Sequence, residues 1–123
     1  MRRVVVTGLG IISPIGNNAS EVLKSLKEAK SGISFDQSHK DMGFRSHVSG
    51  QIKINLQDSI DRKLLRFMGD GASYNYLAML EALEDSGLEE NNISNPMTGL
   101  IMGSGGPSTK NLLRAFDITR DSG

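Results

Sequence analysis

The feature that most constrains the fold is an uninterrupted apolar run over residues 4–12, almost at the start of the chain. It opens with three valines and a threonine, β-branched residues that favour strands. A continuous apolar run, as opposed to an alternating one, is typical of a strand buried on both faces. The sequence therefore predicts a buried strand over residues 4–12. Gly8 and Gly10 are expected where another backbone or a side chain comes close.

The same two glycines raise the alternative of a dinucleotide-binding turn. The G-x-G-x-x-G pattern requires a third glycine at position 13, where this chain has Ser13. It also requires a helix that opens at the glycines, whereas the apolar run continues and Pro14 interrupts the stretch after it. The sequence therefore disfavours a Rossmann oxidoreductase.

The next stretch carries a helix signal. Asn18 with Glu21 three residues later forms a capping-box arrangement, which predicts a helix start, and Gly32 predicts its end. Residues 33–43 are expected to form an irregular surface excursion. Residues 46–54 alternate weakly and predict a short strand or hairpin arm.

The remaining half predicts helices and one further strand. Apolar residues at helical spacing predict a helix over residues 58–68 and another from about residue 72 to Gly87. A loop over residues 91–97 leads to a second buried strand, residues 98–103, and Pro107 can open a last helix. Residues 117–123 are expected to add no further element. Strands that alternate with helices indicate a layered α/β arrangement.

Composition excludes several classes of protein. Fourteen basic and 14 acidic residues balance, which argues against a general nucleic-acid binder. The chain has no cysteine, hence no disulfide framework and no cysteine-based metal site, which suits a cytoplasmic protein. No apolar run approaches the length needed to cross a bilayer. His39 and His47 are interpreted as surface or loop histidines, and no metal site is predicted.

Four separated motifs carry a family resemblance: TGLGIISPIGNN (7–18), RSHVSGQIK (45–53), IDRKLLRFM (60–68) and GLIMGSGG (99–106). In this order they resemble the start of the β-ketoacyl-[acyl carrier protein] synthases, nearest to type I of bacterial fatty-acid synthesis. The resemblance covers essentially all of residues 1–123, although the family is several times longer. It implies an incomplete thiolase-like fold (layered α-β-α-β-α), of which this chain is the N-terminal portion. An unpaired sheet edge and an uncovered apolar face are then expected, and a homodimer when the protein is full-length.

The resemblance also implies a reaction. These synthases condense an acyl thioester with malonyl-carrier by decarboxylative Claisen chemistry, which needs an activated thiolate and donors for the oxyanion. In the family the catalytic cysteine, histidines and lysine lie beyond the matched region. No catalytic residue is therefore predicted here, and the 123-residue chain alone is expected to be inactive. No cofactor is expected, since the substrates are carried on the phosphopantetheine of acyl carrier protein.

Two groups of residues are candidate sites. The family docks its acidic carrier protein with bases of the IDRKLLRFM segment, which implies Arg62, Lys63 and Arg66, with Arg45 of the RSHV motif. The turn after the second strand is implied to lie near the acyl pocket and the dimer contact, at Gly105, Gly106 and Pro107. Pro107 replaces a more usual glycine, which leaves the pocket shape open.

Two alternatives remain open at the level of sequence. The chain is either part of a condensing enzyme or a non-catalytic truncated product that keeps the docking and dimer surfaces. The sequence also does not separate a type I synthase from a type II synthase or a chain-length factor, although RSHVSG and IDRKLLRFM lean toward type I.

Overall fold

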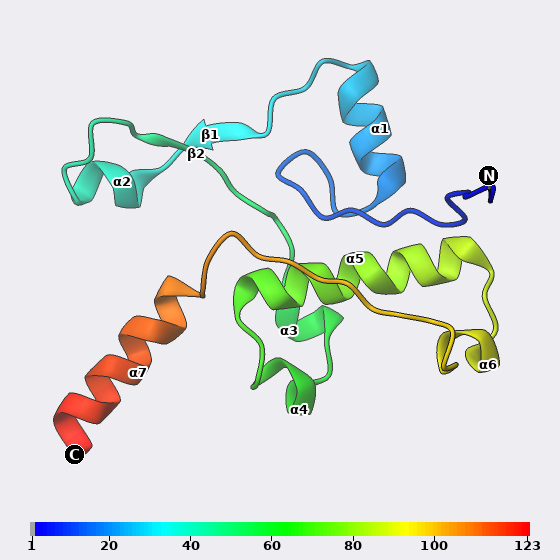
Figure 1. The fold of residues 1–123 in the computed structure, drawn as a ribbon. Helices are drawn as coiled ribbons and strands as arrows, with labels where there is room; N and C mark the ends of the chain where they lie inside the picture. Colours follow the sequence, from blue (N-terminus) through cyan, green and yellow to red (C-terminus); the bar gives the residue numbers. More distant parts are fainter. Residues whose placement is uncertain (1) are drawn as a thin grey trace.

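A computed structural model describes residues 2–123, which form short helices and one small hairpin around a long helix (Figure 1). The β-hairpin pairs β1 (Ile33–Phe35) with β2 (Val48–Gly50) antiparallel, and Phe35 lies opposite Val48. None of the helices in this part of the chain is long and apolar enough to cross a membrane. In chain order the elements are α1 (Ala19–Lys27), β1 (Ile33–Phe35), α2 (Gln37–Asp41), β2 (Val48–Gly50), α3 (Leu56–Ser59), α4 (Arg62–Leu65), α5 (Asp70–Ser86), α6 (Glu90–Ile93) and α7 (Thr109–Ser122).

Helix α5 is the element against which the N-terminal segment packs. A Cβ atom at Gly8 or Gly10 would collide with a backbone carbonyl oxygen of α5, so only glycine allows this approach. Carboxylates of α5 accept the neighbouring backbone N–H groups: Leu9 donates to Asp85 and Ile11 to Glu81, each at 2.9 Å. The predicted close approach at the two glycines is confirmed.

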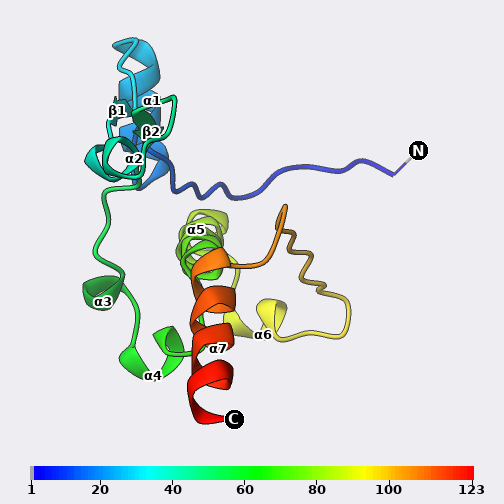
Figure 2. The ribbon, with the colours of Figure 1, turned by 90° about the vertical axis from the view of Figure 1, so that its left-hand side faces the viewer.

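The two predicted buried strands do not form in this chain. Residues 4–12 and 98–103, here called the two extended segments, have no strand partner among residues 2–123 (Figure 2). Their apolar side chains face solvent, as at Val4 (92% exposed) and Ile101 (95% exposed). The prediction of buried strands is wrong for the chain by itself, because a strand is buried only when neighbouring strands and a covering layer exist. The expected uncovered apolar face is confirmed, whereas the expected unpaired sheet edge does not form, since neither segment belongs to a sheet.

The exposed area describes the same deficit for the whole chain. The accessible surface is 10360 Å² for a mass of 13.3 kDa. A compact monomer of this mass exposes about 6,500 Å² by the usual scaling of area with mass. Only Val22 and Ile60 are buried among the apolar side chains of the described residues. The described part of the chain therefore lacks the apolar contacts that a closed core would supply.

Local capping explains where α1 and α5 begin or end. The Asn18 side chain accepts a hydrogen bond from the Glu21 N–H at 2.8 Å, so the predicted N-cap is confirmed. The Glu21 carboxylate reaches back to the N–H of Asn17 rather than of Asn18. α1 ends at Lys27, before the predicted stop at Gly32, and Ala29 adopts φ 50° just beyond it. Gly87 ends α5 with φ 64°, as predicted.

The predicted helix over residues 58–68 is wrong, because it divides into α3 and α4. Ile60 separates them with φ −132° and ψ 137°, an extended conformation, and is only 4% exposed. Asn55 and Asp61 each cap one of the two short helices with a side-chain oxygen. Two strong caps six residues apart, together with burial of Ile60, favour two turns over one continuous helix.

Three further segments are more regular than predicted. The excursion over residues 33–43 contains β1 and α2, and the loop over residues 91–97 begins within α6. α7 continues through the last predicted loop to Ser122. The short strand predicted within residues 46–54 is confirmed as β2.

Candidate functional site

The basic residues of α4 stand on a short helix that a carboxylate caps. Asp61 accepts a hydrogen bond from the Lys63 N–H at 2.7 Å, which places Arg62 and Lys63 in the single turn that follows. Arg66 is the C-cap, and its guanidinium lies 4.4 Å from the centre of the Phe67 ring, a cation–π contact. Here Arg62, Lys63 and Arg66 are called the α4 basic cluster. None of the three forms an ion pair with any side chain of residues 2–123.

A shallow cleft of about 510 Å³ lies beside this cluster and is lined by Arg62, Arg66, Gln57, Asp58 and Leu65. The charge that it presents is mainly positive, since its lining holds two guanidinium groups and a single carboxylate, that of Asp58. Such a surface attracts an acidic partner and is repelled by a basic one.

The structure does not bring Arg45 beside the α4 basic cluster. Arg45 lies in the loop between α2 and β2, and both views place that loop away from α4 (Figures 1 and 2). Its side chain forms no ion pair among the described residues. The four predicted docking residues therefore form two separate cationic points.

The second predicted site belongs to a larger cleft. Gly106 and Pro107 line a space of about 930 Å³ between the N-terminal half of α5 and a stretch that includes the second extended segment and the residues after it. Its apolar wall comes from Met79, Leu100 and Met102. Gly105 is not part of this lining. The space is suited to an apolar chain.

The polar edge of this larger cleft joins α5 to α7. Lys110 pairs with Asp70 at 3.9 Å, and the backbone of Gly69 approaches Ser108, where a Cβ atom on the glycine would lie 2.9 Å from the serine Cβ. Burial and the charge of Asp70 raise the pKa of the nearby Tyr74 hydroxyl. The start of α7 is therefore fixed next to the start of α5.

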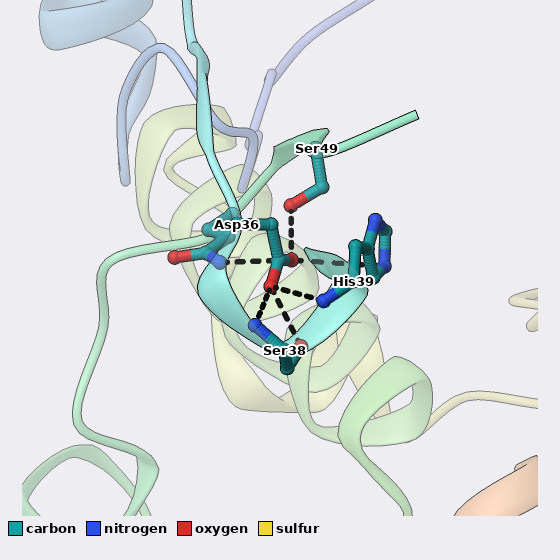
Figure 3. Close-up of polar contacts among 5 residues, drawn as sticks. Asp36, Ser38, His39 and Ser49 are labelled. Atoms are coloured by element: carbon teal, nitrogen blue, oxygen red, sulfur yellow. Dashed lines mark hydrogen bonds and ion pairs between the residues drawn. The ribbon is translucent and has the colours of Figure 1, made fainter. Parts of the chain in front are cut away.

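Sequence reasoning missed a cluster of hydrogen bonds around the Asp36 carboxylate (Figure 3). Its Oδ1 accepts from the N–H and hydroxyl of Ser38 at 3.0 and 2.6 Å, and from the His39 N–H at 3.3 Å. Its Oδ2 accepts from Ser49 Oγ at 2.8 Å and Gln51 Nε2 at 3.1 Å. These bonds, foremost those from the Ser38 and Ser49 hydroxyls, hold the pKa of Asp36 well below its usual range. The local signal was an aspartate two residues before a serine, a capping pattern.

The two histidines lie in the same region as Asp36. His39 is part of α2, with Nε2 3.7 Å from Asp36 Oδ2, and its ring lies 5.1 Å from that of Phe44, tilted by 51°. The His47 ring meets Phe35 edge-on at 6.2 Å. Both are half-buried rather than fully exposed. No group of three or more metal-ligating side chains occurs within residues 2–123.

The geometry at Gly8 and Gly10 does not support a nucleotide site. Both glycines press on the α5 backbone, which leaves no space for a pyrophosphate above them. The next helix, α1, begins only at Ala19, so no helix N-terminus opens at the glycines.

Comparison with known proteins identifies the class. Residues 1–121 match the family described as "Beta-ketoacyl synthase, N-terminal domain", and the chain belongs to this family. The Haemophilus influenzae protein named 3-oxoacyl-[acyl-carrier-protein] synthase 1 is 56% identical over 120 residues, which cover 98% of this chain and 30% of that protein. The Escherichia coli K12 protein of the same name is 53% identical over 121 residues, with the same coverage.

A relative with a different name shows lower identity. The Vibrio cholerae protein named 3-oxoacyl-[acyl-carrier-protein] synthase 2 is 36% identical over 105 residues, covering 85% of this chain and 25% of that protein. The two relatives named synthase 1 are therefore more similar, in line with the type I lean of the motifs. This chain spans about 30% of the length of those two relatives.

Proposed function

We propose that residues 1–123 are the N-terminal portion of a cytoplasmic β-ketoacyl-[acyl carrier protein] synthase of type I. The whole protein would condense an acyl thioester with malonyl-carrier in fatty-acid elongation. Family membership and the names of the relatives at 53–56% identity support this proposal. A layered thiolase-like fold and a homodimer are part of it, and the two exposed extended segments support the need for further strands.

In this proposal the chain contributes binding rather than bond-making. A thioester condensation needs a nucleophilic sulfur and donors for the oxyanion. None of the 123 residues is a cysteine, so the reacting sulfur is not among them. The second candidate, a non-catalytic binding product, rests on this same fact. The intact mass of the protein separates the two, because the enzyme requires a longer chain with a cysteine.

The α4 basic cluster is the proposed docking point for acyl carrier protein, with Arg45 as a second, separate contact. The observation that carries this proposal is that the cluster's three cations make no ion pair within the described residues. Their positive charge therefore remains available to an acidic partner. Long-range attraction between the two accelerates their encounter. The cation–π contact orients the Arg66 guanidinium for the same purpose.

The larger cleft is the proposed wall of the acyl pocket. Gly106 and Pro107 share its lining with the apolar side chains of Met79 and Met102. Methionine side chains adapt their shape to an apolar ligand. Gly105 adjoins this lining in sequence but is not part of it, and we propose that it lies near the dimer contact. No cofactor is part of the proposal, since the carrier's phosphopantetheine brings the substrates.

A charge-reversal experiment tests the docking proposal. In the full-length protein we expect Arg62→Glu with Lys63→Glu to lower the association rate for acyl carrier protein by about 10-fold or more at low salt. The salt dependence of that rate should weaken as well. Lys24→Glu with Lys27→Glu is the matched control, since it changes the same charge on α1, away from α4 (Figure 1). Unchanged affinity in the α4 variant, or an equal loss in the control, would refute docking at α4.

A further inference from the structure

Arg45 is held between two anchored neighbours. On one side the Phe44 N–H donates to the His39 carbonyl at 2.9 Å, and the two rings are in contact in a tilted arrangement. On the other side the His47 carbonyl accepts the Asp36 N–H at 2.7 Å. Only Arg45 and Ser46 stand between these anchors, so the backbone that carries the Arg45 guanidinium is restrained on both sides.

Asp36 is the residue on which both anchors depend. Through Oδ1 it caps α2 and fixes the position of His39, the partner of Phe44. Through Oδ2 it binds Ser49 and Gln51, in and just after β2, which closes residues 33–51 into one unit (Figure 3). This unit of β1, α2 and β2 is here called the 33–51 lobe. The Asp36 residue is only 9% exposed, so water does not replace these bonds at low cost.

We propose that Asp36 is a positioning residue for carrier binding, because its carboxylate closes the 33–51 lobe and thereby presents Arg45 to an acidic partner. The inference rests on the proposed function and adds a residue that would touch neither the carrier nor the substrate. Its benefit is pre-organisation: a loop fixed before binding loses less conformational entropy when the partner arrives. The lowered pKa of Asp36 is consistent with a carboxylate that stays ionised and keeps accepting all its donors.

The charge arrangement agrees with a positioning role. The Asp36 carboxylate lies 3.7 Å from His39 Nε2 and does not pair with Arg45, and Arg45 has no acidic partner among residues 2–123. The arginine charge therefore remains available for a partner, while the aspartate charge is already bonded inside the lobe. An acidic patch on the carrier is the chemistry that fits an isolated guanidinium.

A double-mutant cycle in the full-length protein tests the proposal. Arg45→Ala is expected to weaken carrier binding by about 2- to 5-fold, as for a contact at the edge of an interface. Asp36→Asn, which removes the charge and replaces one acceptor oxygen with an NH2 group, should weaken binding by a similar factor. The double variant should bind no worse than Arg45→Ala alone, because both changes remove the same contact. Additive losses, or unchanged binding in Asp36→Asn, would overturn the proposal.

Two further variants separate positioning from charge and from misfolding. Asp41→Asn makes the same charge change in the same lobe, where Asp41 only accepts from Gln37 at 2.7 Å, and it should not weaken binding. Ser49→Ala keeps every charge but removes the 2.8 Å hydrogen bond to Asp36. It should weaken carrier binding less than Asp36→Asn does, and it should have no effect when Arg45 is already replaced by alanine. If Ser49→Ala has no effect while amide exchange shows an opened lobe, Asp36 does not position Arg45.

The α4 variant keeps the two proposals distinguishable. When Arg62→Glu with Lys63→Glu weakens carrier binding and Arg45→Ala does not, the inference about Asp36 fails and docking at α4 stands. When neither change affects carrier binding, the docking proposal itself fails, and the inference fails with it.

Discussion

The 33–51 lobe and the two extended segments contrast two ways in which a chain satisfies its polar groups. In the lobe, a hairpin of three residue pairs and one carboxylate with five hydrogen bonds close the structure within 19 residues of sequence. In the extended segments, backbone groups have no strand partner among residues 2–123, and side chains such as Ile101 remain 95% exposed. The lobe is complete by itself, whereas the segments need a neighbour that the described residues do not supply.

This contrast separates the parts of the chain that form from local contacts from those that need distant ones. Caps, turns and short hairpins are fixed by residues a few positions apart, so they form in the N-terminal portion alone. A two-sided sheet is stabilised only when strands and covering helices from distant parts of a chain meet. Sites built on local units, such as the α4 basic cluster and Arg45, can therefore be located within this portion. The larger cleft is partly lined by the second extended segment, so its shape depends on what pairs with that segment.

The largest difference between the full-length protein and the 123-residue chain is expected for a change at Ile101, in the second extended segment. In the full-length protein Ile101→Ala should lower the free energy of unfolding by about 2–5 kcal/mol, as for a buried aliphatic side chain. In the 123-residue chain the same change should stay within about 0.5 kcal/mol, as at a surface position. Denaturant unfolding of both proteins measures the difference. Met97→Ala is the control: Met97 is 93% exposed but precedes the segment, and both proteins should tolerate its change.

A smaller effect is expected at Gly10, where the N-terminal segment already has a partner in α5. Gly10→Ala places a Cβ atom against the Ala78 carbonyl oxygen, which should cost about 1–3 kcal/mol in either protein. Gly71→Ala in the first turn of α5 meets nothing within 4 Å and should be neutral or stabilise by up to about 1 kcal/mol. Equal melting temperatures for the two variants would show that the segment does not pack on α5.

The smallest expected effect is a pH dependence confined to the lobe. Asp36 has a folded-state pKa below its ordinary value of 3.8, so its ionised form stabilises the lobe. That contribution is fully present above about pH 4 and is lost as the pH falls from there toward the lowered pKa. The protection factor of the Ser49 amide, which is the exchange rate relative to that of the unfolded chain at the same pH, should therefore fall in acid, and Asp36→Asn should remove that pH dependence. A lobe equally protected at about pH 2 and about pH 6 contradicts this account.

The sequence predicted the features that depend on neighbours along the chain. Asn18 starts α1 and Gly87 ends α5, because capping chemistry lies within a few residues. It missed the Asp36 cluster, since Ser49 and Gln51 lie 13 and 15 residues away and polar alternation does not reveal such pairing. It also joined α3 and α4, because helical spacing does not register that Ile60 leaves the helix to become buried.

The two predicted strands fail for a different reason. Their apolar, β-branched composition is a property of each segment, but a strand is defined by hydrogen bonds to a neighbour. The position of the candidate docking residues was predicted only in part: the bases of α4 gather at one short helix, while the loop between α2 and β2, which carries Arg45, lies apart from it (Figure 1). Distance along the sequence carried no information about that separation.

Amide hydrogen exchange of residues 4–12 and 98–103 tests whether these two segments are strands that the rest of the protein completes. The exchange rates are compared between the full-length protein and the 123-residue chain. The account predicts slow exchange in the full-length protein, where both segments become paired strands. It predicts fast exchange in the short chain, apart from Leu9 and Ile11, whose N–H groups already bind α5 carboxylates. Exchange that is equally slow in both proteins, or equally fast in both, would contradict the claim that these segments are strands completed by the rest of a condensing enzyme.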